Sequence, residues 1–210
     1  MNAMGYDAMA VGNHEFDNPL QVLRKQEGWM HFPLLAANIY DSSGQRLFPA
    51  YHLFRLPGLT VAVFGLTTET TAIVGNPENI KGLTFRSAVD EARELVPRLR
   101  GQADVVIALT HLGYAENELP GIPRTGSETL AKAVPGIDLI VDGHSHSQLG
   151  DPVLENGTVI VQAGEHGKYV GRVDLLRDKG QVRLVGGSLL PVNLAGKMDG
   201  RSAPMGEAVP

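Results

Sequence analysis

Three short polar clusters each follow directly on an apolar, strand-like run, and they hold the residues that could do chemistry. The clusters are Gly12-Asn13-His14-Glu15-Phe16-Asp17, Thr110-His111-Leu112-Gly113 and Gly143-His144-Ser145-His146-Ser147. In an α/β sheet the ends of neighbouring strands converge on one edge, so side chains far apart in sequence can meet there. A lone histidine at a strand end usually just bonds nearby backbone groups, but histidines at three such ends favour a shared site.

The donor atoms in these clusters suit a transition metal. Neutral imidazole nitrogens bind Zn, Mn, Fe or Ni, and an asparagine amide oxygen is a harder donor that suits a mixed nitrogen and oxygen site. We therefore predict that Asn13, His111, His144 and His146 are metal ligands. His144 and His146 would share one side of an extended chain, or point to adjacent metals around a bend.

A catalytic pair is predicted beside these ligands. We expect the Asp17 carboxylate to hold His14 in one tautomer, as carboxylates around metal sites commonly do. His14 would then stabilise charge on a substrate oxygen or protonate a leaving group. Glu15 and Asp17 could instead be metal ligands or loop caps. No substrate-binding residue is predicted.

The remaining candidates carry weaker signals. His31, His52 and His166 do not follow a buried strand in a glycine-bounded loop, so we expect them to be surface or packing residues. The segments 65–68 and 164–169 also punctuate strands, but glycine after a strand usually marks a turn. Lining of the site is the less favoured alternative for both segments.

The elements that must position the clusters alternate between strands and helices. Strands are predicted at 8–11, 33–39, 59–66, 104–109, 137–141, 158–163, 169–176 and 181–190, and helices at the opening residues, 19–26, 87–99 and 127–134. Asn18 is expected to cap the second helix and Ser87 the third. Residues 114–125 should form an exposed loop. This order predicts a layered α/β sandwich.

Composition excludes several classes of function. The 210 residues suit one domain, with 43% hydrophobic and 20% charged residues as in ordinary globular proteins. A net charge of −5 without a basic cluster argues against a nucleic-acid polymer as partner. The absence of cysteine excludes thiolate sites and cysteine nucleophiles. No apolar run approaches a membrane span, and the first ten residues do not resemble a secretion signal.

The clusters, in this order, resemble the calcineurin-like metallophosphoesterases, whose pattern runs D-x-H, G-D, G-N-H-[DE], T-H and G-H-x-H. The last three parts are present, and residues 5–19 are similar to the 5′-nucleotidase branch, a likeness that extends from 36–40 to 191–194. The resemblance implies an α-β-β-α sandwich lacking its first strands. It also implies a partial metallophosphoesterase domain over 1–194, and a frayed tail over 195–210 toward an absent C-terminal nucleotide-binding domain.

The resemblance implies a metal-dependent phosphoester hydrolase of the 5′-nucleotidase or UDP-sugar hydrolase type, with a nucleotide or nucleotide-sugar substrate and a periplasmic or extracellular location. Asn13, His111 and His144 would bind one of two divalent ions, with Zn, Mn or Co expected, and His146 the other. Because the D-x-H and G-D parts would precede Met1, only part of the ligand set is expected. The alternatives are a metal-binding fragment without turnover, an inert module, or the same chemistry on 2′,3′-cyclic nucleotides.

Overall fold

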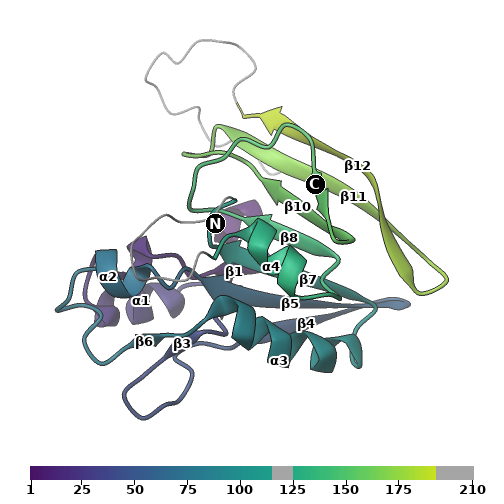
Figure 1. Ribbon diagram of the computed structural model, residues 1–210. Coiled ribbons are helices and arrows are strands. Elements are labelled where there is room, and N and C mark those ends of the chain that lie inside the picture. The colour runs from purple at the N-terminus through teal and green to yellow at the C-terminus, as the bar shows by residue number, and fades with distance from the viewer. Residues whose placement is uncertain (115–124, 193–210) are drawn as a thin grey trace.

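A six-stranded mixed sheet forms the centre of the structure, a computed structural model that describes residues 1–114 and 125–192 (Figure 1). In spatial order, the strands are β4 (Tyr51–Leu56), β5 (Leu59–Thr67), β7 (Val105–His111), β8 (Leu139–Asp142), β10 (Thr158–Gln162) and β9 (Val153–Glu155). The four central strands run parallel, and both edge strands run antiparallel to their neighbours. The carboxyl ends of the central strands therefore meet at one edge.

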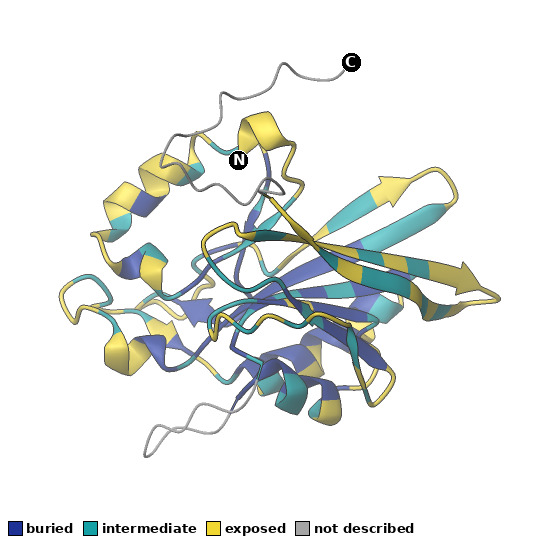
Figure 2. Ribbon diagram, turned by 90° about the horizontal axis from the view of Figure 1, so that it is seen from above, coloured by how far each residue is buried: buried dark blue, intermediate teal, exposed yellow. Residues whose placement is uncertain are grey.

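Two helices cover one face of this sheet. They are α3 (Ala88–Arg100) and α4 (Ser127–Ala133), and α3 begins where the Ser87 hydroxyl accepts a hydrogen bond from the Asp90 amide. Their apolar faces join β5, β7, β8 and β10 in the main core. The largest fully buried side chains of this core are Phe64, Leu66, Leu99, Leu112, Leu130, Ile140 and Ile160. Figure 2 shows these central strands in dark blue.

The N-terminal segment builds a second, smaller core. The elements of this segment are η1 (Asn2–Met4), β1 (Met9–Ala10), η2 (His14–Phe16), α1 (Leu20–Glu27), β2 (Leu34–Leu35) and β3 (Ile39–Tyr40). Two short elements come from later in the chain: α2 (Thr71–Val74) and β6 (Thr84–Phe85), whose Phe85 joins this smaller core. β1 pairs with β2 in parallel, and β3 pairs with β6 antiparallel. β2 crosses β5 so closely that a Cβ at Gly65 would overlap the Leu35 carbonyl. β1 also contacts β5 and β7 of the central sheet.

A long hairpin completes the chain that the structure describes. β11 (Tyr169–Asp178) pairs with β12 (Gln181–Pro191), and the pair forms a sheet of its own. Figure 2 shows this hairpin in teal and yellow, since its residues are half-buried or exposed. Within the described residues, no helix is both long and apolar enough to cross a membrane.

The predicted α/β class is confirmed, with strands of a central sheet and helices packed in layers against it. The strand over 59–66 and the helix over 87–99 are confirmed within one residue at each end. The calls for a loop over 114–125 and a tail over 195–210 fall mainly or wholly outside the described residues.

Other expectations about the elements are wrong. The opening helix is only the short turn η1, because its apolar spacing lasts too few residues to bury a face. Asn18 does not cap α1, which begins at Leu20 after an extended Pro19 and has no side-chain cap. The run 33–39 is split between β2 and β3, since the intervening Asn38 side chain bonds the Thr67 backbone instead of continuing a ladder. The strands β4, β6 and β9 are not predicted at all.

Candidate metal centre

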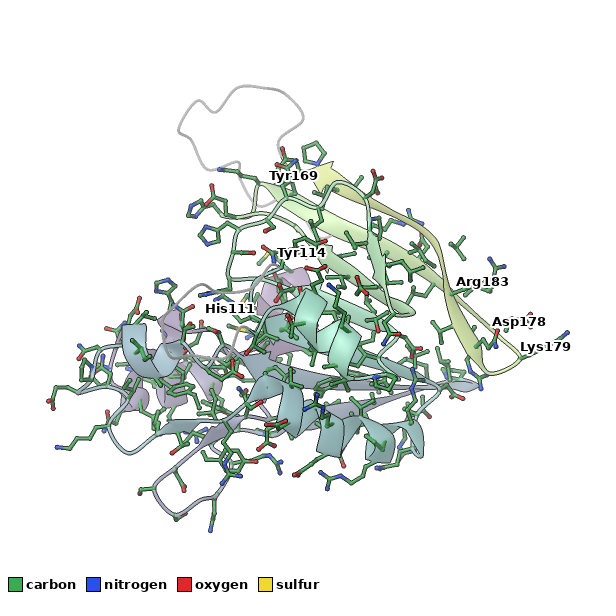
Figure 3. The ribbon with its side chains drawn as sticks, in the orientation of Figure 1. His111, Tyr114, Tyr169, Asp178, Lys179 and Arg183 are labelled. Carbon is green, nitrogen blue, oxygen red and sulfur yellow. The ribbon has the colours of Figure 1, made fainter. Side chains whose placement is uncertain are left out.

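The site lies where the loops after β1, β7 and β8 meet. Asn13 follows β1, His111 is the last residue of β7, and His144 follows β8. Two hydrogen bonds tie the chain after β1 and the end of β7 to the end of β5: Thr67 Oγ1 donates to the Val11 carbonyl at 2.7 Å, and the Thr68 amide donates to the His111 carbonyl at 3.0 Å. Figure 3 shows His111 at the end of β7, on the opposite side of the molecule from the tip of the β11–β12 hairpin.

Three of the four predicted ligands converge on one point. His111 Nε2 lies 2.8 Å from Asn13 Oδ1, and His144 Nδ1 lies 3.2 Å from the same oxygen. The two imidazole centroids are 5.0 Å apart, with their planes at 61°. Because an amide oxygen only accepts, each ring donates an N–H to it here. A cation could take the same three atoms once each ring carries its proton on the other nitrogen.

Two glycines hold the His111 ring in place. A Cβ at Gly12 would lie 3.0 Å from His111 Nδ1, and one at Gly143 would lie 3.2 Å from the same atom. Both distances are tighter than ordinary side-chain contacts, so larger residues would push the ring away. The glycines that precede Asn13 and His144 therefore make room for the imidazole that stands between the two loops.

Burial keeps the central imidazoles neutral. Burial first, and then the like charges of the neighbouring His144, His14 and His146, lower the pKa of His111 to about 4. The pKa of His144 is also lowered, first by burial and then by His14 and His146. A neutral ring with a free lone pair is the form that binds a metal, so these rings need not lose a charge-carrying proton near pH 7.

The fourth predicted ligand, His146, has a different partner. Its Nδ1 lies 3.0 Å from Glu165 Oε2, and its side chain is 60% exposed. The same carboxylate oxygen lies 3.2 Å from His166 Nε2, and Lys168 Nζ donates to its other oxygen at 2.7 Å. The Lys168 hydrogen bond is the main cause of the lowered Glu165 pKa, so the carboxylate is ionised and accepts the His146 Nδ1–H.

Glu165 and His166 lie beside His146, although neither residue was predicted to belong to the site. His166 is exposed, as expected for a surface residue, yet its ring centroid lies 6.0 Å from that of His146. The signal in the sequence for these two residues is the glycine-bounded segment 164–169, for which an ordinary turn is the favoured prediction and lining of the site the alternative. By contrast, His52 makes an edge contact with the Phe54 ring in β4, and the amide of His31 donates a hydrogen bond to the Asn2 side chain.

The predicted contact between His14 and Asp17 is present at η2. His14 Nδ1 lies 2.9 Å from Asp17 Oδ2, one turn apart on a short helix that exposes both side chains to solvent. The intervening Glu15 is a loop cap, since its Oε2 accepts from the Gly12 amide at 2.6 Å. The contact uses His14 Nδ1, and the His14 side chain is 76% exposed.

The donor set fits a divalent transition metal in kind. Two neutral imidazoles and an amide oxygen match the mixed site that such metals accept. Three donors are fewer than the four of a closed tetrahedral site, which leaves positions for substrate or further ligands. Across residues 1–114 and 125–192, no three His, Cys, Asp or Glu side chains come close enough to hold a metal, so the Asn13 amide is essential to the trio.

Comparison with known proteins bears on this geometry. The model of the calcineurin-like phosphoesterase family matches residues 3–148, which include Asn13, His111, His144 and His146. The chain is 46% identical to a 5′-nucleotidase of Vibrio cholerae over 221 residues, which cover 95% of this chain and 40% of the relative. It is 44% identical over 227 residues to Protein UshA of Escherichia coli, covering 96% of this chain and 41% of that protein.

The fold is similar to solved structures as well. A putative 5′-nucleotidase from Staphylococcus aureus superposes with a TM-score of 0.80 at 30% identity, over 91% of this chain and 39% of that one. The chain thus spans about two fifths of the length of these relatives. Calcineurin-like phosphoesterases use divalent metals, which agrees with the donor types found at the strand ends.

Proposed function

This chain belongs to the calcineurin-like phosphoesterase family, and from that premise we propose that it carries out metal-dependent phosphoester hydrolysis of the 5′-nucleotidase or UDP-sugar hydrolase type. One observation carries the proposal. Asn13, His111 and His144 come from three separate strand ends, and one imidazole nitrogen of each histidine lies within 3.2 Å of the Asn13 amide oxygen. This convergence gives the family resemblance a chemical basis in the residues themselves.

In this proposal, Asn13, His111 and His144 hold one divalent ion and His146 faces a second one, with Zn, Mn or Co expected. The ions would lower the pKa of water, neutralise phosphate charge and align an in-line attack on phosphorus. The protein supplies the neutral ligands, because burial lowers the pKa values of His111 and His144. Glu165 supports the orientation of His146, since its acceptance of Nδ1–H leaves Nε2 with a lone pair for the ion.

His14 and Asp17 form the proposed catalytic pair. The Asp17 carboxylate accepts the Nδ1–H of His14, which fixes the ring orientation and leaves Nε2 to meet a phosphoryl or leaving-group oxygen. The exposure of both side chains lets a substrate reach that nitrogen without rearrangement of the core.

The relatives suggest the substrate class and the location. We propose a nucleotide or nucleotide sugar as substrate and a periplasmic or extracellular location, on the strength of the 5′-nucleotidases and Protein UshA. Residues 1–194 would then form a partial metallophosphoesterase domain that corresponds to about two fifths of the length of the relative. Turnover of 2′,3′-cyclic nucleotides is the alternative on the same metal chemistry.

A paired metal titration and activity assay tests the function. The chain, His111→Ala and the control His52→Ala would be titrated with Mn²⁺ and Zn²⁺ while thermal unfolding is followed, and AMP, UDP-glucose and bis-p-nitrophenyl phosphate would be assayed. Metal should raise the melting temperature of the chain and of His52→Ala but not of His111→Ala. Turnover that disappears in His111→Ala would support hydrolysis.

Metal binding without turnover would favour the second candidate, a metal-binding piece, which the small number of converging donors also favours.

A further inference from the structure

Two buried polar side chains stand directly behind the histidine loop. Asp142 ends β8 and is 8% exposed, and Gln162 ends β10 and is 2% exposed. They are register partners in the parallel β8–β10 ladder. We propose that Asp142 and Gln162 form a positioning pair that fixes the backbone on which His111, His144 and His146 stand. This inference rests on the proposed function, because it assigns the pair to the same metal centre.

Asp142 fixes the strand on both sides of His111. Its Oδ1 accepts from Thr110 Oγ1 at 2.6 Å and from the Leu112 amide at 3.1 Å. The paired register of β7 and β8 stops at Leu109 and Val141, so these two bonds continue the connection beyond the last backbone pair. Because successive side chains of a strand point to opposite faces of the sheet, holding the Thr110 side chain on the face of Asp142 directs His111 to the opposite face. Asp142 therefore aims an imidazole that it does not touch.

Gln162 fixes the loop that carries the other two histidines. Its Nε2 donates to the Gly143 carbonyl at 3.1 Å, and its Oε1 accepts from the Ser147 amide at 2.5 Å. Between these two anchors, His144 has φ of 79° and His146 has φ of 55°. Left-handed backbone is costly for residues other than glycine and persists where the surroundings enforce it. A side chain that holds both ends of the loop supplies that enforcement.

The hydrogen bonds of the pair have one possible direction. The Ser147 amide can only donate, so the oxygen of the Gln162 amide must face it and the NH₂ group must face Asp142. Asp142 Oδ2 accepts that NH₂ at 2.9 Å, which leaves Oδ1 for Thr110 and Leu112. The loop and the end of β7 are thus joined by a relay in which every donor has an acceptor.

The direction of the relay predicts how it can be broken and restored. Asp142→Asn places an NH₂ group against the Gln162 NH₂, and a flip of Gln162 would only move the clash to the Ser147 amide. Gln162→Glu places two carboxylates together. In the double variant the new amide at 142 donates to the new carboxylate at 162, whose other oxygen still accepts from Ser147. The double substitution loses the hydrogen bond to the Gly143 carbonyl and keeps the rest of the relay.

The test combines Mn²⁺ titration by calorimetry with amide hydrogen exchange at Ser147 in the metal-free chain. Each single variant should weaken Mn²⁺ binding by about 10- to 100-fold, the usual effect of losing a group that orients metal ligands. Each should also speed exchange at Ser147, and the double variant should recover most of both losses. Glu91→Gln is the matched control, since it converts another buried carboxylate to an amide, away from the loop and beside Arg46. It should leave both readouts unchanged.

Three outcomes would overturn the inference: unchanged Ser147 exchange in both single variants, a double variant no better than the worse single one, or equal effects of Glu91→Gln. Should Asp142→Asn fail to fold, Gln162→Met, which keeps the length and removes the donor and acceptor, must still speed exchange at Ser147. If the unaltered chain binds no Mn²⁺, the proposed function fails, whereas the exchange measurements on metal-free protein still decide the inference.

Discussion

The buried imidazole of His111 should make the metal-free protein lose stability as the pH falls below neutrality. The folded chain holds the pKa of His111 at about 4, against 6.5 for an ordinary histidine, first because of burial and then because of His144, His14 and His146. The unfolded chain therefore binds a proton that the folded chain refuses. Stability from this residue is complete above pH 6.5 and is lost as the pH falls toward 4.

The size of the effect follows from the shift. Each pKa unit corresponds to about 1.4 kcal/mol, so a shift from 6.5 to about 4 has an upper limit of roughly 3 kcal/mol in the free energy of unfolding. At pH 5, where the unfolded imidazole is almost fully protonated and the folded one almost not, the loss relative to pH 7 should be about 2 kcal/mol. That is a large part of the stability of an ordinary domain.

Urea unfolding at pH 7 and pH 5 with a chelator present measures this loss. The variant His111→Gln keeps an N–H that can reach Asn13 but cannot titrate, and His52→Gln changes a histidine that makes an edge contact with Phe54 outside the site. The unaltered chain and His52→Gln should each lose about 2 kcal/mol more than His111→Gln between the two pH values. Equal losses in all three proteins would refute the argument, since carboxylates and the other histidines titrate in each of them.

Three further predictions concern catalysis and packing. Asp17→Ala, which frees the His14 ring, should lower kcat on AMP by about tenfold or more while Mn²⁺ affinity stays the same; steady-state kinetics beside a metal titration checks this. Ser87→Ala removes the cap of α3 and should cost about 1 kcal/mol in urea unfolding. Gly65→Ala drives a methyl group into the backbone of β2 and should cost at least about 1–3 kcal/mol, whereas Gly186→Ala, in open space, should cost far less by the same measurement.

The central strands could be predicted from the sequence because the side chains on both of their faces are almost all apolar. Runs such as 59–66 and 104–109 are almost continuously apolar, as buried parallel strands are. β4 lies at an edge, with His52 and Arg55 among its half-buried and exposed residues, and so carries no such run. β9, of three residues, is too short for any periodicity to show.

The site was predictable to the same extent. Asn13, His111 and His144 lie at or just past the ends of strands that pattern alone reveals, so their convergence could be expected. Glu165 reaches His146 only because Gly164 and Gly167, both at positive φ, turn the chain back toward the loop, and sequence patterns do not encode that approach. Asp142 and Gln162 each end an apolar strand as many polar residues do. Their relay to Ser147 is evident only from the distances.

The left-handed backbone at His144 and His146 lowers the stability of the fold at the two positions that supply imidazoles to the site. Glycine or asparagine would adopt φ near 79° and 55° at lower energy than histidine does. Directed evolution for heat resistance alone would therefore enrich glycine or asparagine at both positions. The most heat-stable variants of such a library would lack the two imidazoles. Selection for thermal stability and selection for metal binding therefore favour different residues at these two positions.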